Sequence, residues 1–283
     1  MRTALLTVAA AYLFLAVLLY FLQEQILFPG ARTQGQAIAR VEPPAGADLL
    51  RLRTRSGHHV AALFLPARNA AGKALDGRRP TILFFYGNGS WLHSALPVCE
   101  ELQRLGAGVL VPEYLGYGLS DGSPGEAGVR ETADAAYDYL LTRPGVDPHR
   151  IFAVGYSLGG AAAIDLASRH PLAGLATLNA FSSMREMAAL CFPYLPTSLL
   201  LRHPFESRSR ISRVHCPILL VHGTADELVP FRMRDRLAAA AGGPVTRLDI
   251  PGGTHNDLFG VAGPRILAAL SRLLRNSGSE SGS

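Results

Sequence analysis

The sequence predicts an α/β fold, in which a mostly parallel sheet carries helices on both faces, together with a separate membrane-spanning helix. From residue 80 onward, short apolar runs that read as strands alternate with longer runs that read as helices. Repeated strand–helix units of this kind give a parallel sheet that is covered on both faces. An uncharged apolar run over residues 3–22 predicts the additional helix.

The composition favours one large domain with an appendage. The chain has 283 residues, of which 48% are hydrophobic and 17% charged, so it can fill a sizeable core and is unlike a disordered chain. Its net charge of +5 comes from arginines that are scattered along the sequence. Because no basic stripe alternates with aromatic residues, we expect no nucleic-acid partner.

Residues 3–22 would form a helix of about 30 Å, the thickness of the apolar core of a bilayer. The run has no polar face, which argues against a buried core helix. A cleaved signal peptide is the alternative, with Arg2 as a minimal positive region. The apolar run is long for such a peptide, however, and no A-x-A site follows it before Gln23. We therefore expect residues 1–24 to be an uncleaved, single-pass signal anchor, with an orientation that the flanking charges leave open.

The next segments predict an irregular connection and then one edge of the sheet. Residues 23–46 contain three prolines that break regular structure. Residues 49–54 and 59–65 read as two strands, and alternating arginines in the first indicate a solvated face. Residues 67–79 read as a loop of small and polar residues.

Alternating strands and helices follow, and ligands should bind beyond the carboxyl ends of the strands. The expected strands cover residues 81–86, 108–113, 150–156, 172–179, 217–222 and 245–250. The expected helices cover residues 91–105, 129–141, 158–168, 232–241 and 258–275.

Residues 180–216 interrupt this alternation with a mixture of apolar and arginine side chains. They would form either helices that pack on the edge of the sheet or a small lid whose apolar underside holds an acyl chain. A lid beside a membrane anchor favours a lipid-like substrate. The main domain would then cover residues 25–275, and the Gly/Ser-rich residues 276–283 would be a disordered tail.

Residues 155–159 have the pattern G-x-S-x-G between a predicted strand and a predicted helix. This context is that of a nucleophile elbow, a sharp turn that exposes its central serine, here Ser157, at the end of a sheet. The flanking glycines let the strand and the helix approach closely. The alternative is an ordinary glycine-rich turn with a surface serine.

A serine hydroxyl needs a base to take its proton and an acid to orient that base. The single lysine, Lys73, lies in a small-residue loop, so a histidine is the expected base. His255 follows two glycines and a threonine after a strand, and Asp226 lies in the loop after the preceding strand. The chain order Ser157, Asp226, His255 fits a Ser-His-Asp triad, and all three should lie at one edge of the sheet.

Other residues fit these roles less well. His222 ends a strand and is predicted to hold the loop of the acid. Glu227 could replace Asp226, but the shorter side chain fits a tight turn better. Asp257 is too close in sequence to His255 to be its preferred partner. The other histidines weighed as bases fall on helices or connectors: His93, His170 and His215.

Two backbone amides are predicted to bind the oxyanion of the reaction. One belongs to Leu158, directly after the nucleophile, and the other to Asn88, in a Gly-Asn-Gly-Ser loop that follows a strand. Loss of one such donor typically lowers the rate about 10²–10³-fold. A plain Gly/Asn turn is the alternative interpretation of this loop.

Together these motifs resemble the α/β-hydrolase superfamily, and most closely its membrane-anchored α/β-hydrolase-domain proteins related to serine aminopeptidases and monoacylglycerol lipases. The resemblance implies the α/β-hydrolase fold from about residue 81 to the last helix. Residues 25–29, after the anchor, are also similar to that group. The matching segments are residues 86–89, 114–122, 155–159, 222–226 with 229–230, and 253–256.

The chain departs from the family pattern at two places. Tyr86 stands where the family usually has histidine, and its hydroxyl could replace the hydrogen bond that supports the oxyanion loop. Glu113 stands where the family usually has aspartate, in Glu-Tyr-Leu-Gly instead of Asp-Tyr-Arg-Gly. The second change should alter packing near the site without touching the triad.

The sequence therefore predicts a membrane-anchored serine hydrolase that needs no cofactor and no metal. Its substrate would be a small-molecule or lipid-like carboxylic ester or thioester with an apolar acyl group. Hydrolysis of an amide, as in serine aminopeptidases, is one alternative. A non-catalytic, membrane-tethered binding module is the other, and an intact triad argues against it. The oligomeric state stays open.

Overall fold

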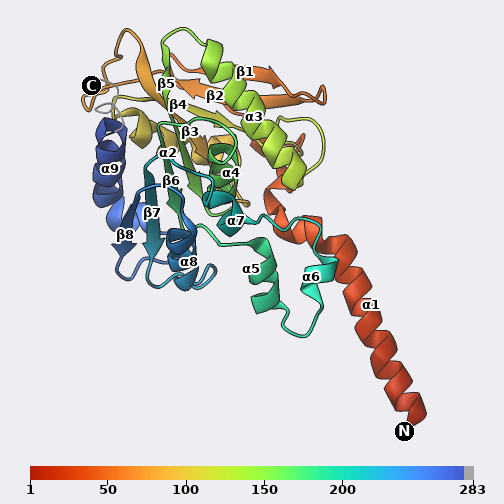
Figure 1. Ribbon diagram of the computed structural model, residues 1–283. Coiled ribbons are helices and arrows are strands. Elements are labelled where there is room, and N and C mark those ends of the chain that lie inside the picture. The colour runs from red at the N-terminus through yellow and green to blue at the C-terminus, as the bar shows by residue number, and fades with distance from the viewer. Residues whose placement is uncertain (277–283) are drawn as a thin grey trace.

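The computed structural model describes residues 1–276, and its body is an eight-stranded sheet with helices on both faces (Figure 1). The strands are β1 (Asp48–Arg53), β2 (His59–Leu65), β3 (Arg79–Phe85), β4 (Gly108–Pro112), β5 (Val146–Tyr156), β6 (Gly174–Leu178), β7 (Ile218–Gly223) and β8 (Val245–Ile250). Their order in the sheet is β1-β2-β4-β3-β5-β6-β7-β8. Only the β1–β2 and β2–β4 pairs of this sheet are antiparallel, which confirms the predicted fold class.

The helices that follow the strands form two layers. They are α2 (Leu92–Gln103), α3 (Glu126–Thr142), α4 (Leu158–Ala167), α5 (Met184–Cys191), α6 (Thr197–Leu200), α7 (Ser207–Ile211), α8 (Arg232–Ala240) and α9 (Leu258–Asn276). The crossovers through α3, α4 and α8 advance across the sheet in one direction, whereas the crossover through α2 runs the other way. Because parallel crossovers are right-handed, α2 lies on the opposite face from α3, α4 and α8.

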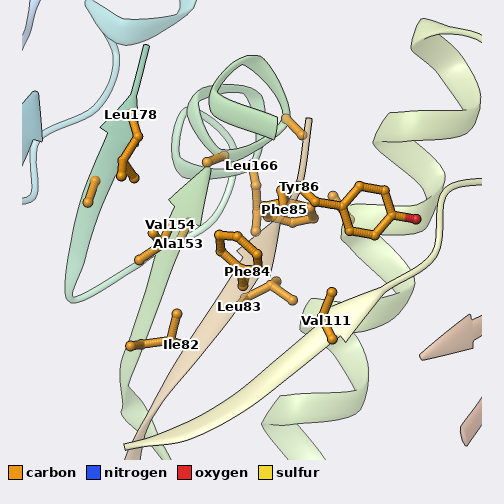
Figure 2. Close-up of a cluster of buried hydrophobic side chains, with 14 of the residues drawn as sticks. Ile82, Leu83, Phe84, Phe85, Tyr86, Val111, Ala153, Val154, Leu166 and Leu178 are labelled. Atoms are coloured by element: carbon orange, nitrogen blue, oxygen red, sulfur yellow. The ribbon is translucent and has the colours of Figure 1, made fainter. Parts of the chain in front are cut away.

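The centre of the core explains why the middle strands are apolar throughout. Figure 2 shows side chains of β3 and β5 packed with Leu178 of β6, Val111 of β4 and Leu166 of α4. Ile82, Leu83 and Phe85 are all fully buried, so β3 has no solvated face. A parallel strand covered on both sides reads as a continuous apolar run. These strands form a rigid base whose carboxyl ends hold the site loops.

The helix α1 (Arg2–Leu27) projects from the domain, with its first residues farthest from the sheet (Figure 1). Among residues 1–276 it is the one helix long and apolar enough to cross a membrane, with a mean hydropathy of 2.5. A signal sequence near the N-terminus has the same length and composition. α1 is therefore a candidate membrane span.

Several elements extend beyond their predicted bounds. α1 continues past residue 24 and ends just before Pro29, because the residue before a proline disfavours helical geometry. Two 3₁₀ helices, η1 (Pro29–Thr33) and η2 (Ala37–Ala39), then occupy part of the segment expected to be irregular. β5 begins at Val146 and includes Pro148, at a point where the register with β3 shifts.

The last two predicted segments have different outcomes. Residues 180–216 contain the three short helices α5, α6 and α7. α7 packs against α4 and α8, whereas α5 and α6 contact each other beside α1 (Figure 1). Of the predicted tail, residues 276–283, Asn276 ends α9 and residues 277–283 lie outside the described residues.

Candidate active site

Ser157 lies in the sharp turn between β5 and α4. Its backbone has φ 53° and ψ −115°, a left-handed conformation that a residue with a side chain rarely adopts. The glycines on either side make the turn possible. A Cβ atom on Gly155 would overlap the backbone of Gly159, and one on Gly159 would overlap the carbonyl of Phe85. The G-x-S-x-G pattern therefore forms the tight turn that the sequence predicts.

His255 and Asp226 reach Ser157 from two other loops at the same edge of the sheet. His255 follows β8, and Asp226 follows β7. The His255 Nε2 lies 3.0 Å from the Ser157 Oγ, and the His255 Nδ1 lies 2.8 Å from the Asp226 Oδ2. Ser157, Asp226 and His255 are 7%, 8% and 4% exposed, so the hydrogen-bonded chain is shielded from water. The structure thus brings together the three side chains selected from the sequence.

The loop around Asp226 fixes the direction of its carboxylate. The amides of Leu228 and Val229 donate to Oδ1 at 2.9 and 2.8 Å, which leaves Oδ2 to accept from His255 Nδ1. With its Nδ1–H engaged in this way, the imidazole presents Nε2 as the acceptor for the Ser157 hydroxyl. Glu227, the alternative acid, is exposed and takes no part in these contacts.

His222 stabilises the loop that carries Asp226, as predicted. Its Nε2–H donates to the carbonyl of Val229 at 3.0 Å, and the ring is 1% exposed. Burial lowers the pKa of His222, which keeps the ring neutral near pH 7. Since it contacts the acid loop and not Ser157, His222 is a positioning residue.

Asn179 is a buried residue of the site that the sequence analysis missed. It follows β6 and has φ 48°, which an asparagine tolerates better than most residues. Its Nδ2 donates to the carbonyls of Thr254 and His255 at 3.0 and 3.1 Å, and its Oδ1 accepts from the Gly223 amide at 2.9 Å. One side chain therefore joins the loops of the acid and the base.

Two further contacts shape the His255 loop. The Tyr156 hydroxyl donates to the carbonyl of His255, and the Asp257 carboxylate accepts from the amide of Thr254 at 2.7 Å. Asp257 thus stabilises the loop backbone and does not contact the imidazole, in agreement with its rejection as the orienting acid.

Asn88 and Leu158 lie beside Ser157, where the sequence places the oxyanion donors. Both residues line the cavity into which Ser157 opens. Within residues 1–276, neither backbone amide has a hydrogen-bond partner, so both can donate to a ligand. The Asn88 carbonyl accepts from the Gly30 amide at 3.0 Å and from the Tyr117 hydroxyl at 2.9 Å, which fixes the loop.

The expected role of Tyr86 is wrong. Its hydroxyl is buried beside the Glu113 carboxylate and, within residues 1–276, makes no hydrogen bond to the oxyanion loop. Figure 2 shows the hydroxyl pointing away from the labelled core side chains. The ring packs edge-on against Tyr114, with centroids 4.9 Å apart. Tyr117 supplies the contact to the loop instead, from a segment that the sequence analysis treated only as a family motif.

Glu113 is fully buried below this loop and accepts two backbone hydrogen bonds. The Leu92 amide, at the start of α2, donates to Oε1 at 3.0 Å, and the Leu119 amide donates to Oε2 at 2.7 Å. Burial raises the pKa of Glu113, although these amides act in the opposite direction. Glu113 therefore holds the starts of two segments near the site and, within the described residues, does not contact the triad.

The site opens into an apolar cavity of about 220 Å³. Residues of α1, α5 and α6 form most of its wall, together with Phe181 and Val229. Ser157 and Asn88 contribute polar groups to this lining. Apolar residues of the segment 180–216 thus line the same cavity as Ser157.

Comparison with known proteins agrees with this architecture. The dienelactone hydrolase family model matches residues 120–250. The chain is 34% identical to the uncharacterized protein Rv2307c of Mycobacterium tuberculosis over 249 residues, which cover 88% of this chain and 85% of that protein. It is 33% identical to the α/β-hydrolase domain-containing protein WAV2 of Arabidopsis thaliana over 201 residues, 64% of this chain and 65% of the relative.

Solved structures share the fold. The esterase Pf2001 of Pyrococcus furiosus superposes with a TM-score of 0.67 at 16% identity, over 82% of this chain and 91% of the esterase. Fold, site geometry and relatives define the class, and the chain belongs to the α/β-hydrolase superfamily.

Proposed function

We propose that the protein is a serine hydrolase that cleaves a carboxylic ester or thioester of an apolar acyl group. The observation that carries the proposal is the buried hydrogen-bonded chain from Ser157 through His255 to Asp226. A serine held in a strained turn beside a histidine, with that histidine oriented by a carboxylate, is the arrangement that activates a hydroxyl for attack on a carbonyl.

In the proposed reaction, the Ser157 Oγ forms a bond to the acyl carbon while His255 Nε2 takes the hydroxyl proton. The amides of Asn88 and Leu158 donate to the oxyanion that develops. The bond to the leaving alcohol or thiol then breaks, and His255 returns the proton to that group. Water attacks the acyl-enzyme by the same route in reverse, which releases the carboxylic acid and restores Ser157.

The character of the cavity supports the acyl substrate. Its lining residues are mostly apolar, and among residues 1–276 no aspartate or glutamate lines it. A peptide's free amino group would lack a carboxylate partner there, which disfavours the aminopeptidase-like alternative. An apolar acyl chain would replace water against these side chains, a favourable exchange of about 25 cal/mol per Å² of apolar surface.

The test is labelling by a fluorophosphonate, which phosphonylates an activated serine as fluoride leaves. We expect the wild type to react, and Ser157→Ala and His255→Ala to stay unlabelled. Ser271→Ala, in α9 and far from the site in the chain, is the control that should react normally. Absence of labelling in the folded wild type would contradict the proposal and favour the binding module.

We also propose that residues 1–24 remain attached and anchor the domain, residues 25–275, to a membrane. The length and hydropathy of α1 support an anchor. The full chain should stay with membranes after a carbonate wash, and mass spectrometry should find α1 intact. A soluble product that lacks α1 would instead identify a cleaved signal sequence.

A further inference from the structure

α1 lies against the proposed active site and forms part of its wall. Five residues of its last three turns line the cavity that contains Ser157: Leu19, Tyr20, Gln23, Ile26 and Leu27. Their spacing of three to four residues places them on one face of the helix. The C-terminal end of α1 contacts the oxyanion loop: the Asn88 Nδ2 donates to the Leu27 carbonyl at 3.0 Å. The candidate membrane span is thus continuous with the site.

The buried side-chain amide of Gln23 joins α1 to the C-terminal end of α6. Gln23 is 8% exposed, although it follows an apolar run of the helix. Its Nε2 donates to the Leu200 carbonyl at 3.1 Å, and its Oε1 accepts from the Arg202 amide at 2.8 Å. A buried polar side chain with both ends satisfied fixes the position of the two elements that it joins.

Charged groups reinforce this connection. Glu24 lies 3.2 Å from the Arg202 guanidinium and 3.6 Å from the His203 Nε2. The His203 Nδ1 in turn accepts from the Glu126 amide at 3.2 Å, at the start of α3. The Arg202 guanidinium also lies 5.3 Å from the centroid of the Tyr20 ring. α1 is therefore tied to the body of the domain and is more than a flexible tether.

The opposite wall is the hairpin of α5 and α6, which follows α1 away from the sheet (Figure 1). At its tip, the Tyr194 carbonyl accepts from the Tyr12 hydroxyl at 2.9 Å. The part of α1 from Tyr12 to its C-terminal end is about 22 Å long, at 1.5 Å per residue. Exposed apolar side chains lie on both elements: Tyr194 and Leu199 of the hairpin are 89% and 83% exposed, and the large apolar residues of α1 are also mostly exposed. Exposed apolar side chains on both elements fit a lipid phase better than water.

We infer that α1 is one wall of the acyl site, and that the acyl chain of a membrane lipid ester reaches Ser157 from the bilayer, between α1 and the α5–α6 hairpin. This inference rests on the proposed serine hydrolase and names its substrate class. The chemistry at Ser157 is unchanged; the bilayer end of the cavity admits the chain, and the ester carbonyl meets the amides of Asn88 and Leu158.

The test uses the full chain in phosphatidylcholine vesicles that contain a hexadecyl fluorophosphonate with a diazirine along its chain. The Ser157 Oγ forms a bond to phosphorus as fluoride leaves and His255 takes the hydroxyl proton. Light then expels N2 from the diazirine, and the resulting carbene inserts into bonds of nearby residues. We expect crosslinks in the peptides of residues 19–27 and 184–201. Serum albumin in the external solution, which removes probe from water, should leave labelling unchanged.

Each other outcome overturns a different statement. A wild type that no fluorophosphonate labels contradicts the serine hydrolase itself. Labelling at Ser157 with crosslinks only elsewhere contradicts the role of α1 while the hydrolase stands. Labelling that albumin abolishes shows that the chain arrives from water and contradicts entry from the bilayer.

A matched pair of substitutions gives a second test. Leu19→Trp places a large side chain on the cavity face, whereas Leu18→Trp places it at a neighbouring position that does not line the cavity. We expect Leu19→Trp to lower the ratio of kcat/KM for a hexadecanoyl ester to that for an acetyl ester about tenfold, the size of an ordinary overpacking effect. Leu18→Trp should leave the ratio unchanged. Equal ratios in the two variants would overturn the inference.

Discussion

The two sides of the cavity are built in different ways. On the sheet side, Ser157, His255 and Asp226 are buried, and each is held by hydrogen bonds to or from the backbone beyond the ends of the strands. On the α1 side, a few polar contacts join the long helix α1 to the end of the short helix α6, and large apolar residues such as Tyr194 are exposed. Bond-making groups must be positioned to within about 0.5 Å, whereas apolar burial is not directional. Under the proposed function, the sheet edge carries out the chemistry, and α1 with the α5–α6 hairpin selects the acyl chain.

Asp226→Asn should have the largest effect on the sheet side. The amide would keep the shape of the loop but would favour the wrong tautomer of His255, so we expect kcat for an acetyl ester to fall about 10⁴-fold. Glu227→Gln, at the exposed neighbouring position, is the control and should retain nearly full activity. Less than a tenfold loss in Asp226→Asn would place the orienting acid elsewhere.

Asn179→Ala tests whether the sheet edge acts as one unit. The substitution removes the side chain that joins Gly223 to the carbonyls of Thr254 and His255, and leaves those buried groups unpaired. We expect a loss of about 1–3 kcal/mol in the free energy of unfolding. A matched control is Asn69→Ala, whose side chain accepts from Lys73 in an exposed loop.

A purely structural role for Asn179 would lower stability and leave the kinetics of the folded enzyme intact. A positioning role predicts in addition a lower kcat with little change in KM, because the acyl cavity is untouched. The two measurements together therefore separate these roles, and an unchanged kcat in the folded variant would limit Asn179 to stability.

Glu113→Gln examines the base of the oxyanion loop. Because burial raises the pKa of Glu113, the folded state binds more protons than the unfolded state between the ordinary and the raised pKa. The stability of the wild type relative to Glu113→Gln should therefore fall as pH rises through that interval, by about 1.4 kcal/mol per pH unit, and level off above it. Thermal unfolding from acid to neutral pH measures the trend, and exposed Glu42→Gln should show none. A rising trend would require a carboxylate that the fold stabilises.

How much the sequence predicts also differs between the two sides. Ser157, Asp226 and His255 could be selected because reactive residue types at the ends of strands converge at one edge of a parallel sheet. Asn179 could not, since an asparagine that bonds to backbone carbonyls belongs to no motif; its position directly after a buried strand was the one available signal. The Tyr86 expectation failed because sequence position does not show where a hydroxyl points.

The α1 side was even less accessible to sequence reasoning. The length and composition of the apolar run predict a helix, and the structure has this helix at α1. The contact between Gln23 and Leu200, however, joins residues 177 positions apart. Pairings at that separation depend on how the whole chain folds, and no local propensity encodes them.

The smallest expected effect, and the one most specific to the α1 side, comes from Gln23→Ala. The change removes the hydrogen bonds to Leu200 and Arg202 that hold the two walls together. Since one such bond contributes about 0.5–1.5 kcal/mol, we expect KM for a hexadecanoyl ester to rise roughly two- to tenfold, with kcat for an acetyl ester unaltered. Gln25→Ala, an exposed position on the same helix, is the matched control and should behave as the wild type. If Gln23→Ala lowered both activities equally, the two sides of the cavity would act as one rigid unit, and the division between chemistry and chain selection would be wrong.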